Sequence, residues 1–244
     1  MILLLDAGNS RIKWGVRQAG TWLVRGVCAT SEAASLADQL ATYPLRRALL
    51  CCVADMSSRA TLEALVTARV EEFFWLTPGV ADHGVRSAYQ PPESLGPDRY
   101  AALVAASRLG LGDCVVVSVG TALTVDALAA GGDFLGGVIA PGPELMRAAL
   151  SLGTAGVREL AGDTQEFPVS TGAAVSGGVS LALSGVVNGM RQRLARLCGK
   201  SVTVVLSGGA RALLDNLLES PVLAVDDLVL NGLAWIAKDR AWDD

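Results

Sequence analysis

Two similar segments, 112 residues apart, constrain the fold of this chain of 244 residues more than any other feature. Residues 3–10 read LLLDAGNS, and residues 115–122 read VVVSVGTA. Each segment combines an apolar run typical of a buried strand, a polar residue, a glycine that permits a sharp turn, and the start of a second strand. Comparable lengths of chain follow each segment, which favours an internal duplication with a boundary near residue 112. We expect the active site in the cleft between the two halves.

The composition predicts a packed core rather than disorder. Hydrophobic residues make up 51% of the chain and charged residues 18%. The net charge is −4, and the basic residues are scattered, which argues against a nucleic-acid partner. The densest basic stretch is residues 191–196, and we interpret it as the solvated face of a helix.

The cysteines and the apolar segments indicate a cytoplasmic protein. Five cysteines occur at irregular spacing with no C-x-x-C pair, which favours reduced thiols and makes a zinc site improbable. The apolar run of residues 1–5 ends at Asp6 and is too short for a signal peptide or a membrane span.

The hydrophobic periodicity predicts a mixed α/β protein. Strands are expected at residues 1–5, 11–17, 48–53, 114–119, 123–128 and 202–206. Helices are expected at residues 32–42, 57–74 (capped by Ser57 or Ser58), 97–109, 144–152, 171–197, 210–218 and 227–239. Residues 77–97 are predicted to form an ordered loop, and residues 131–143 a glycine-rich turn with a short strand.

The first turn, residues 6–10, has the residue types of a phosphate-binding loop. Gly8 allows a ligand to approach the backbone closely, and free N–H groups beside Asn9 and Ser10 could hold phosphate oxygens. Asp6 could position Mg²⁺ through water. A plain hairpin turn explains the same residues equally well. The candidate nucleotide-binding residues of this segment are Asp6, Gly8, Asn9, Ser10, Arg11 and Lys13.

Two later glycine segments could contact a nucleotide. Gly120 and Thr121 form the matching turn of the second half, although an ordinary hairpin is the simpler interpretation. Residues 207–209, Ser-Gly-Gly, follow a predicted strand and precede a predicted helix, a position that suits either nucleotide contact or an ordinary turn. The G-x-G-x-x-G dinucleotide pattern is absent from the sequence.

The segment Gly96-Pro97-Asp98-Arg99 is the strongest catalytic candidate. Pro97 suits the first turn of a helix, which places Asp98 near the positive end of the helix dipole. Asp is also common at helix starts for structural reasons alone. Arg99 could bind a carboxylate or phosphate, and Asp98 could accept a proton from an attacking hydroxyl, as phosphoryl transfer requires.

Four segments in this order resemble the type III pantothenate kinases over nearly the whole chain. They are residues 6–13, 89–99, 120–126 and 136–142. The resemblance implies an α/β fold of two ribonuclease-H-like halves, with mixed sheets flanked by helices, on the actin-like ATPase superfold. Residues 1–112 would carry the first phosphate loop and the catalytic Asp. Residues 113–244 would carry the second phosphate loop, a glycine-rich nucleotide segment and a dimerisation helix.

The resemblance also implies the reaction and the role of each residue. The family phosphorylates pantothenate to 4'-phosphopantothenate with ATP and Mg²⁺, the first step toward coenzyme A, as a cytoplasmic homodimer. Asp98 resembles the general base, and Thr121 resembles an ATP contact. The implied pantothenate-binding residues are Tyr89, Gly96, Pro97, Asp98, Arg99 and Thr171, the last of which can face the partner subunit's site.

One departure from the family pattern concerns a monovalent cation, K⁺ or NH₄⁺. Many members carry an acid at the position of Ser118, and that acid holds the cation. A neutral Ser cannot supply the charge, so no protein metal ligand is assigned and the cation requirement stays open. Two alternatives also stay open: a kinase of the same superfold with another small hydroxyl or carboxylate acceptor, and a non-catalytic nucleotide-binding regulator.

Overall fold

A computed structural model describes residues 1–79, 83–158, 160–163 and 165–242 of the chain. Its contacts divide the chain into two compact units. The first unit comprises Met1–Gly110 together with Asp227–Asp244, and the second comprises Leu111–Asp226. The division after residue 110 lies close to the expected boundary. The C-terminal segment, expected in the second half, belongs to the first unit instead.

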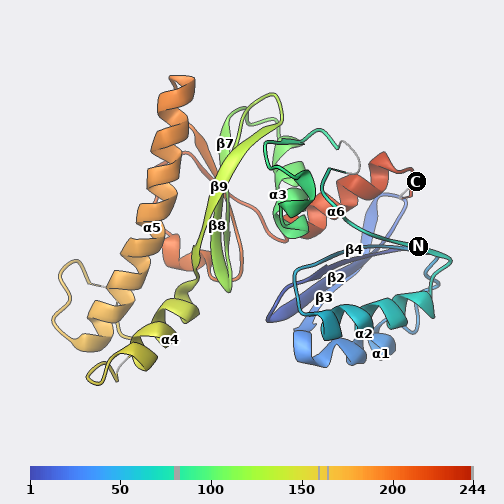
Figure 1. Ribbon diagram of the computed structural model, residues 1–244, viewed down its shortest axis with the longest axis horizontal. Coiled ribbons are helices and arrows are strands. Elements are labelled where there is room, and N and C mark those ends of the chain that lie inside the picture. Colours follow the sequence, from blue (N-terminus) through green and yellow to red (C-terminus); the bar gives the residue numbers. More distant parts are fainter. Residues whose placement is uncertain (80–82, 159, 164, 243–244) are drawn as a thin grey trace. The chain divides into compact units, whose positions relative to one another are not determined.

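The first unit is built on a five-stranded sheet with the order β3-β2-β1-β4-β5 (Figure 1). The strands are β1 (Ile2–Ala7), β2 (Arg11–Gln18), β3 (Thr21–Ala29), β4 (Arg47–Cys52) and β5 (Glu72–Trp75). β1, β2 and β3 are joined as antiparallel neighbours, whereas β4 and β5 run parallel to β1.

The second unit repeats this arrangement. Its strands are β7 (Cys114–Val119), β8 (Ala122–Leu128), β9 (Asp133–Pro141), β10 (Thr203–Ser207) and β11 (Val222–Ala224). They lie in the order β9-β8-β7-β10-β11, with β7, β8 and β9 antiparallel in turn and β10 and β11 parallel to β7. The same order and directions in both units support the predicted duplication.

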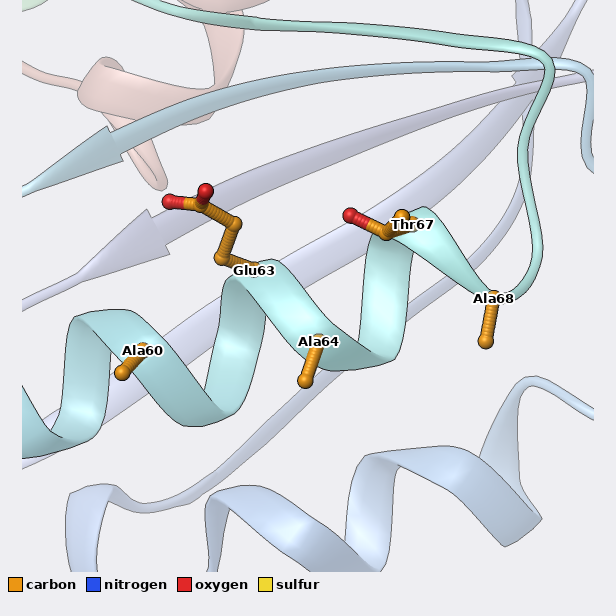
Figure 2. A pocket seen from close by; sticks show the side chains of 5 residues that line it. All are labelled: Ala60, Glu63, Ala64, Thr67 and Ala68. Carbon is orange, nitrogen blue, oxygen red and sulfur yellow. The ribbon is translucent and has the colours of Figure 1, made fainter.

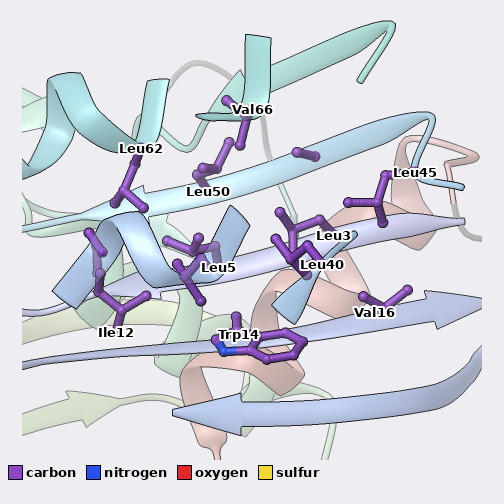
Figure 3. Close-up of a cluster of buried hydrophobic side chains, with 14 residues drawn as sticks. Leu3, Leu5, Ile12, Trp14, Val16, Leu40, Leu45, Leu50, Leu62 and Val66 are labelled. Carbon is purple, nitrogen blue, oxygen red and sulfur yellow. The ribbon is translucent and has the colours of Figure 1, made fainter. Parts of the chain in front are cut away.

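One face of the first sheet packs against the short helices before β4 and the helix after it. These are η1 (Thr30–Ser35), α1 (Leu36–Gln39) and α2 (Met56–Thr67). Leu3 and Leu5 of β1 point into a core that includes Ile12 and Trp14 of β2 and Leu62 of α2 (Figure 3). Side chains alternate along a strand, so Ile2, Leu4 and Asp6 lie on the opposite face.

That opposite face is covered by α3 (Pro97–Ser107) and α6 (Leu228–Asp239). The two helices pack closely on each other, and a side chain at Gly232 of α6 would overlap the carbonyl oxygen of Ala101 in α3. A two-residue strand, β6 (Arg86–Ser87), and a 3₁₀ turn, η2 (Pro92–Ser94), precede α3. They fall in the segment predicted as a loop, of which residues 80–82 lie outside the described residues.

The long helix α5 (Thr171–Cys198) organises the second unit. It packs against β7 and β8, and α4 (Pro143–Gly153) packs against β9 and α5. Val179, Leu183 and Val187 of α5 enter the second core. Among the described residues, α5 is the one helix long and apolar enough to cross a membrane. Half of that window is buried in the structure, as in a helix of a protein core.

The basic stretch at residues 191–196 is not a uniformly solvated face as predicted. The Arg191 side chain is buried and donates hydrogen bonds to the carbonyl oxygens of Val202, Glu219 and Ser220 at 2.9, 2.9 and 2.6 Å. It therefore ties α5 to the segments before β10 and β11, while Arg193 and Arg196 are exposed.

The other differences from the predicted elements have local causes. The predicted helix 57–74 ends at Thr67, and its last residues form β5, because Phe73 and Phe74 pack beside β4. Its cap is Asp55, which accepts a hydrogen bond from the N–H of Ser58 at 2.7 Å. The predicted helix 32–42 is the end of η1 followed by the four-residue helix α1, and the predicted helix 210–218 is a single 3₁₀ turn, η3 (Arg211–Leu214).

Candidate functional site

Asp6 lies at the end of β1, on the face covered by α3 and α6. The strand register places it between Lys13 of β2 and Cys51 of β4. The Cys51 thiol donates a hydrogen bond to Asp6 Oδ1 at 3.3 Å. Burial raises the pKa of Cys51 well above its ordinary value, with the Asp6 charge as the next cause, so the thiol keeps the proton that it donates.

The carboxyl groups of Asp6 and Asp98 act on each other. The pKa of Asp6 is raised to about 6, chiefly by burial and next by the negative charge of Asp98, while the Cys51 hydrogen bond opposes both effects. Burial likewise raises the pKa of Asp98, against the lowering effect of the Arg99 N–H group. Two interacting carboxyl groups with raised pKa values are typical of an acid–base site.

The start of α3 holds Asp98 in place. Pro97 occupies the first turn, as predicted, and Asp98 Oδ1 accepts a hydrogen bond from the N–H of Arg99 at 2.8 Å. A side chain at Gly96 would place its Cβ 2.7 Å from Asp98 Oδ1, so the glycine leaves room for the carboxylate.

Arg99 and Tyr89 form a second polar pair in the first unit. Arg99 is buried, and its Nη1 donates a hydrogen bond to the Tyr89 hydroxyl at 3.2 Å. The guanidinium carbon also lies 5.6 Å from the centre of the Tyr89 ring. The segment after β6 and the start of α3 therefore present a cation and a phenol together, a pair suited to a ligand carboxylate.

The turn after β1 is a closed loop with exposed side chains. The N–H of Gly8 donates to the carbonyl oxygen of Arg11 at 3.0 Å. Thr30 fixes the loop from outside, because its hydroxyl donates to the Gly8 carbonyl oxygen at 2.8 Å and its N–H to that of Ser10 at 3.1 Å. The side chains of Asn9, Ser10 and Arg11 are exposed. The role of Thr30 was not predicted, since no local pattern connects it to this turn.

Lys13 pairs with a carboxylate that the sequence did not indicate. Its Nζ lies 3.1 Å from Asp227 Oδ1, and Arg25 Nη1 lies 3.3 Å from Asp227 Oδ2. Asp227 immediately precedes α6 and is 214 residues from Lys13 in sequence. Its charge also raises the pKa of Asp6, as a smaller effect, so Asp227 acts electrostatically on the Asp6 side of the sheet.

In the second unit, backbone segments converge on the turn at Gly120 and Thr121. The N–H of Gly120 donates to the Ala122 carbonyl oxygen, and the N–H of Gly142 donates to that of Thr121, both at 2.9 Å. A side chain at Gly142 would overlap the carbonyl oxygens of Gly120 and Thr121, and one at Gly208 would overlap the Val119 carbonyl. The close approach therefore depends on both glycines, which the sequence placed in separate motifs.

Ser118 lies in a row of hydroxyl residues. The register places Ser118 of β7 between Thr124 of β8 and Ser207 of β10. Asp126, two residues beyond Thr124, is buried. Thr171 is exposed at the first position of α5, where Ser170 accepts a capping hydrogen bond from the N–H of Ala173 at 3.3 Å.

The predicted site residues thus fall into two sets, one in each unit. The structure brings together Asp6, Lys13 and Asp98 in the first unit, and Arg99 with Tyr89. In the second unit, Thr171 opens α5 and is a separate feature from the Gly120–Thr121 turn. An open depression on α2 lies outside both sets (Figure 2). It is lined by Ala60, Glu63, Ala64, Thr67 and Ala68, none of which is a candidate site residue.

The donor groups fit Mg²⁺ carried by a nucleotide better than a metal held by the protein alone. In the part of the chain that the structure describes, no three His, Cys, Asp or Glu residues form a metal-binding group. Mg²⁺ in kinases is usually held by one or two carboxylates together with phosphate oxygens and water. Asp6 is a carboxylate of this kind, and Lys13 and the exposed Arg11 are cations on the neighbouring strand β2.

Comparisons with solved structures agree with the fold of the chain. The chain is similar to a Campylobacter jejuni protein assigned to the Baf family of transcriptional activators (TM-score 0.64, 22% identity, 98% of both chains). It is also similar to the activator of 2-hydroxyisocaproyl-CoA dehydratase from Clostridium difficile, solved with bound ADPNP (TM-score 0.56, 13% identity, 98% of this chain and 95% of that one). These likenesses show the actin-like ATPase fold.

The sequence comparisons identify the family. A family model described as type III pantothenate kinase matches residues 2–193. The type III pantothenate kinase of Aromatoleum aromaticum is 41% identical over 242 residues, which cover 99% of each chain. The two-unit fold and the ordered motifs agree with both matches, and the chain belongs to the type III pantothenate kinase family.

Proposed function

We propose that this protein transfers the terminal phosphoryl group of ATP to the primary hydroxyl of pantothenate, with Asp98 as the general base. The observation that carries the proposal is the placement of Asp98 at the start of α3, where its carboxyl group interacts with Asp6 across from Lys13. Family membership supplies the substrate.

The reaction needs little from the protein beyond alignment, charge and one proton acceptor. As the hydroxyl oxygen bonds to the terminal phosphorus and the bond to the ADP oxygen breaks, the hydroxyl proton passes to the Asp98 carboxylate. Burial raises the pKa of Asp98, which makes it a better proton acceptor than an exposed Asp.

The phosphates are assigned to the first turn and to Lys13. Gly8 has no side chain to block the approach of phosphate to the turn, Asn9 and Ser10 present exposed polar side chains, and Arg11 adds charge. Asp6 would hold Mg²⁺ through water, and Mg²⁺ supplies positive charge that offsets the phosphates. In the second unit, Gly120 and Thr121 are assigned to ATP.

Pantothenate is assigned to the residues around Arg99. Its carboxylate suits the Arg99 guanidinium and the Tyr89 hydroxyl, which are already paired at 3.2 Å. Gly96 and Pro97 shape this end of α3, and Thr171 contributes a hydroxyl. The neutral row at Ser118 supports a weak or absent dependence on K⁺ or NH₄⁺, because hydroxyl and carbonyl oxygens bring no negative charge.

The protein would act as a homodimer in the cytoplasm. Support for the dimer comes from the outer side of α5, where exposed Leu181 lies among the small residues Ala174, Gly178, Ala182 and Gly185. Gly178 and Gly185 have open space where a side chain would stand. Phe167 is also strongly exposed, at 81%. Apolar surface of this kind favours burial against a second copy of the chain.

The test of the proposal is the release of ADP from Mg-ATP with and without pantothenate. The expected result is release that depends on pantothenate, with similar rates in potassium, ammonium and sodium buffers. Replacing Asp98 by Asn should lower kcat by roughly a hundredfold to ten-thousandfold. Asn retains an oxygen that can accept the Arg99 N–H bond, so the fold should be unchanged by circular dichroism.

Glu93→Gln is the matched control, because it removes an exposed carboxylate five residues away in η2. Its kcat should equal that of the parent. An Asp98→Asn variant with full turnover would exclude Asp98 as the base. Folded protein that binds ATP but releases no ADP with pantothenate would favour another acceptor or a non-catalytic regulator.

A further inference from the structure

Asp227 stands at the start of a helix without acting as its cap. An Asp at this position normally accepts a hydrogen bond from a backbone N–H in the first turn. Here the carboxylate makes no capping bond to α6. Its two oxygens pair instead with Lys13 of β2 and Arg25 of β3, at 3.1 and 3.3 Å.

The backbone around Asp227 orients this carboxylate. Asp227 has a φ of 49° and a ψ of 41°, a left-handed conformation that few residues other than Gly, Asn and Asp adopt readily. The helix that follows is fixed on α3 by the close approach at Gly232. Asp227 is therefore presented from a packed element, whereas Lys13 is a long side chain on a hairpin strand.

Lys13 needs such a partner to have a defined direction. Its ammonium ends a flexible four-carbon stem, and 34% of the side chain is exposed. An ammonium has three donors, so one hydrogen bond to Asp227 leaves two for other acceptors. Arg25 pairs with the second oxygen of Asp227 at 3.3 Å, which leaves the first oxygen to Lys13.

We propose that Asp227 is a positioning residue that holds the Lys13 ammonium on the Asp6 side of the sheet for the phosphates of the nucleotide. This inference rests on the proposed role of Lys13 in ATP binding. Asp227 itself touches neither ATP nor pantothenate in this proposal. Its effect reaches the nucleotide through Lys13 alone.

A double-mutant cycle in the full chain tests this. The four proteins are the parent, Lys13→Met, Asp227→Asn and the double variant. The measurements are KM for Mg-ATP and kcat in ADP release, and the dissociation constant of Mg-ADP by titration calorimetry. Each single variant should raise KM and the Mg-ADP dissociation constant roughly fivefold to tenfold, with less change in kcat. The double variant should be no weaker than Lys13→Met alone.

Two further variants separate the effect of the Lys13–Asp227 pair from effects on folding and on the other cation. Asn and Gly both accept the left-handed backbone, so Asp227→Gly should reproduce the result of Asp227→Asn with a similar melting temperature. Arg25→Gln removes the other cation from Asp227 but retains the Lys13 pair. Its KM for Mg-ATP should stay within about twofold of the parent, since the Lys13 pair is the one that matters for binding.

Three outcomes would overturn the inference. Equal weakening by Asp227→Asn in the presence and absence of Lys13 would show that Asp227 acts through the fold. Tighter nucleotide binding by Asp227→Asn, with Lys13 and with Lys13→Met alike, would show that Asp227 acts as a charge that repels phosphate. If Lys13→Met leaves Mg-ATP binding unchanged, the assignment of Lys13 falls and this inference falls with it. Pantothenate-dependent turnover and its loss in Asp98→Asn would still stand.

Discussion

Asp6 lowers the stability of the fold when it is ionised, yet the proposed chemistry uses its carboxylate. It follows four buried apolar residues in β1 and carries an ionisable group onto a packed face of the sheet. Burial disfavours its charged form, and the nearby Asp98 disfavours it further. Lys13 and the Cys51 thiol offset part of this effect. A carboxylate in such surroundings lowers the stability of the folded chain whenever it is ionised.

The stability of the protein should therefore depend on pH through Asp6. A pKa of about 6 in the folded state, against 3.8 for an ordinary Asp, means that the folded chain binds the proton more tightly than the unfolded chain. Protonated Asp6 therefore contributes to the free energy of unfolding. This contribution is fully present below pH 3.8 and is lost as the pH rises through 6, by about 3 kcal/mol in all. Urea unfolding of the parent and of Asp6→Asn between pH 4 and 7.5 measures it.

The free energy of unfolding of Asp6→Asn should lack this decline, so the difference between the two proteins should change across that range. Asp38→Asn, which removes an exposed carboxylate in α1, is the control and should follow the parent. Parallel curves for the parent and Asp6→Asn would contradict the raised pKa.

Some residue-level features followed from the sequence and others could not. The side chains of β2 follow the two-residue period of a strand, with Ile12 and Trp14 in the core and Arg11 and Lys13 on the other face. The partners of Asp6 and Lys13 were out of reach, because Cys51 and Asp227 meet them only through the strand register and the packing of α6. The catalytic and binding roles of the site residues remain predictions.

At the scale of elements, buried central strands were the easiest to predict. β1, β4, β7 and β10 are continuous apolar runs, as strands buried on both faces must be. Edge strands were missed. β3 alternates exposed and half-buried residues, and β11 has three exposed residues, so neither stands out from a loop by hydrophobicity.

The element-level prediction concerns the start of α4. Replacing Gly142 by Ala would force its Cβ into the carbonyl oxygens of Gly120 and Thr121, which must then separate from the helix. We expect a loss of about 1–3 kcal/mol in the free energy of unfolding and a higher KM for Mg-ATP. Chemical denaturation and ADP release measure the two effects.

Gly153→Ala, at the other end of the same helix, is the matched control. It has open space for a methyl group, so it should leave KM unchanged and should not destabilise the protein. A Gly142→Ala variant as stable and as active as the parent would show that the contact with the Gly120–Thr121 turn does not matter.

At the scale of the whole molecule, the chain repeats one topology in two units. The repeat was predictable from two strand–turn–strand segments, because both preserve the apolar run and the glycine. The return of the C-terminal helix to the first unit was not predictable, since an amphipathic helix does not specify which sheet it covers. The exposed side of α5, where Leu181 lies among small residues, also concerns the whole molecule, because a second chain could pack there.

Association of two chains through α5 gives the whole-molecule prediction. Leu181→Glu places a charge on this side of the helix, and burying an unpaired charge at an interface is costly. Light scattering should give twice 25.2 kDa for the parent and 25.2 kDa for the variant. Leu23→Glu, on exposed β3, should remain a dimer. A dimeric Leu181→Glu protein would exclude α5 as the interface.

The return of α6 to the first unit has a consequence for synthesis on the ribosome. Domains usually fold in the order in which they emerge, with the N-terminal one first. Here the first unit lacks the helix that covers Ile2, Leu4 and Asp6 until residues 227–242 have been translated, after all of the second unit. During that interval, the sheet that starts the chain keeps an apolar face without its native cover. The unit that begins first is therefore the one completed last.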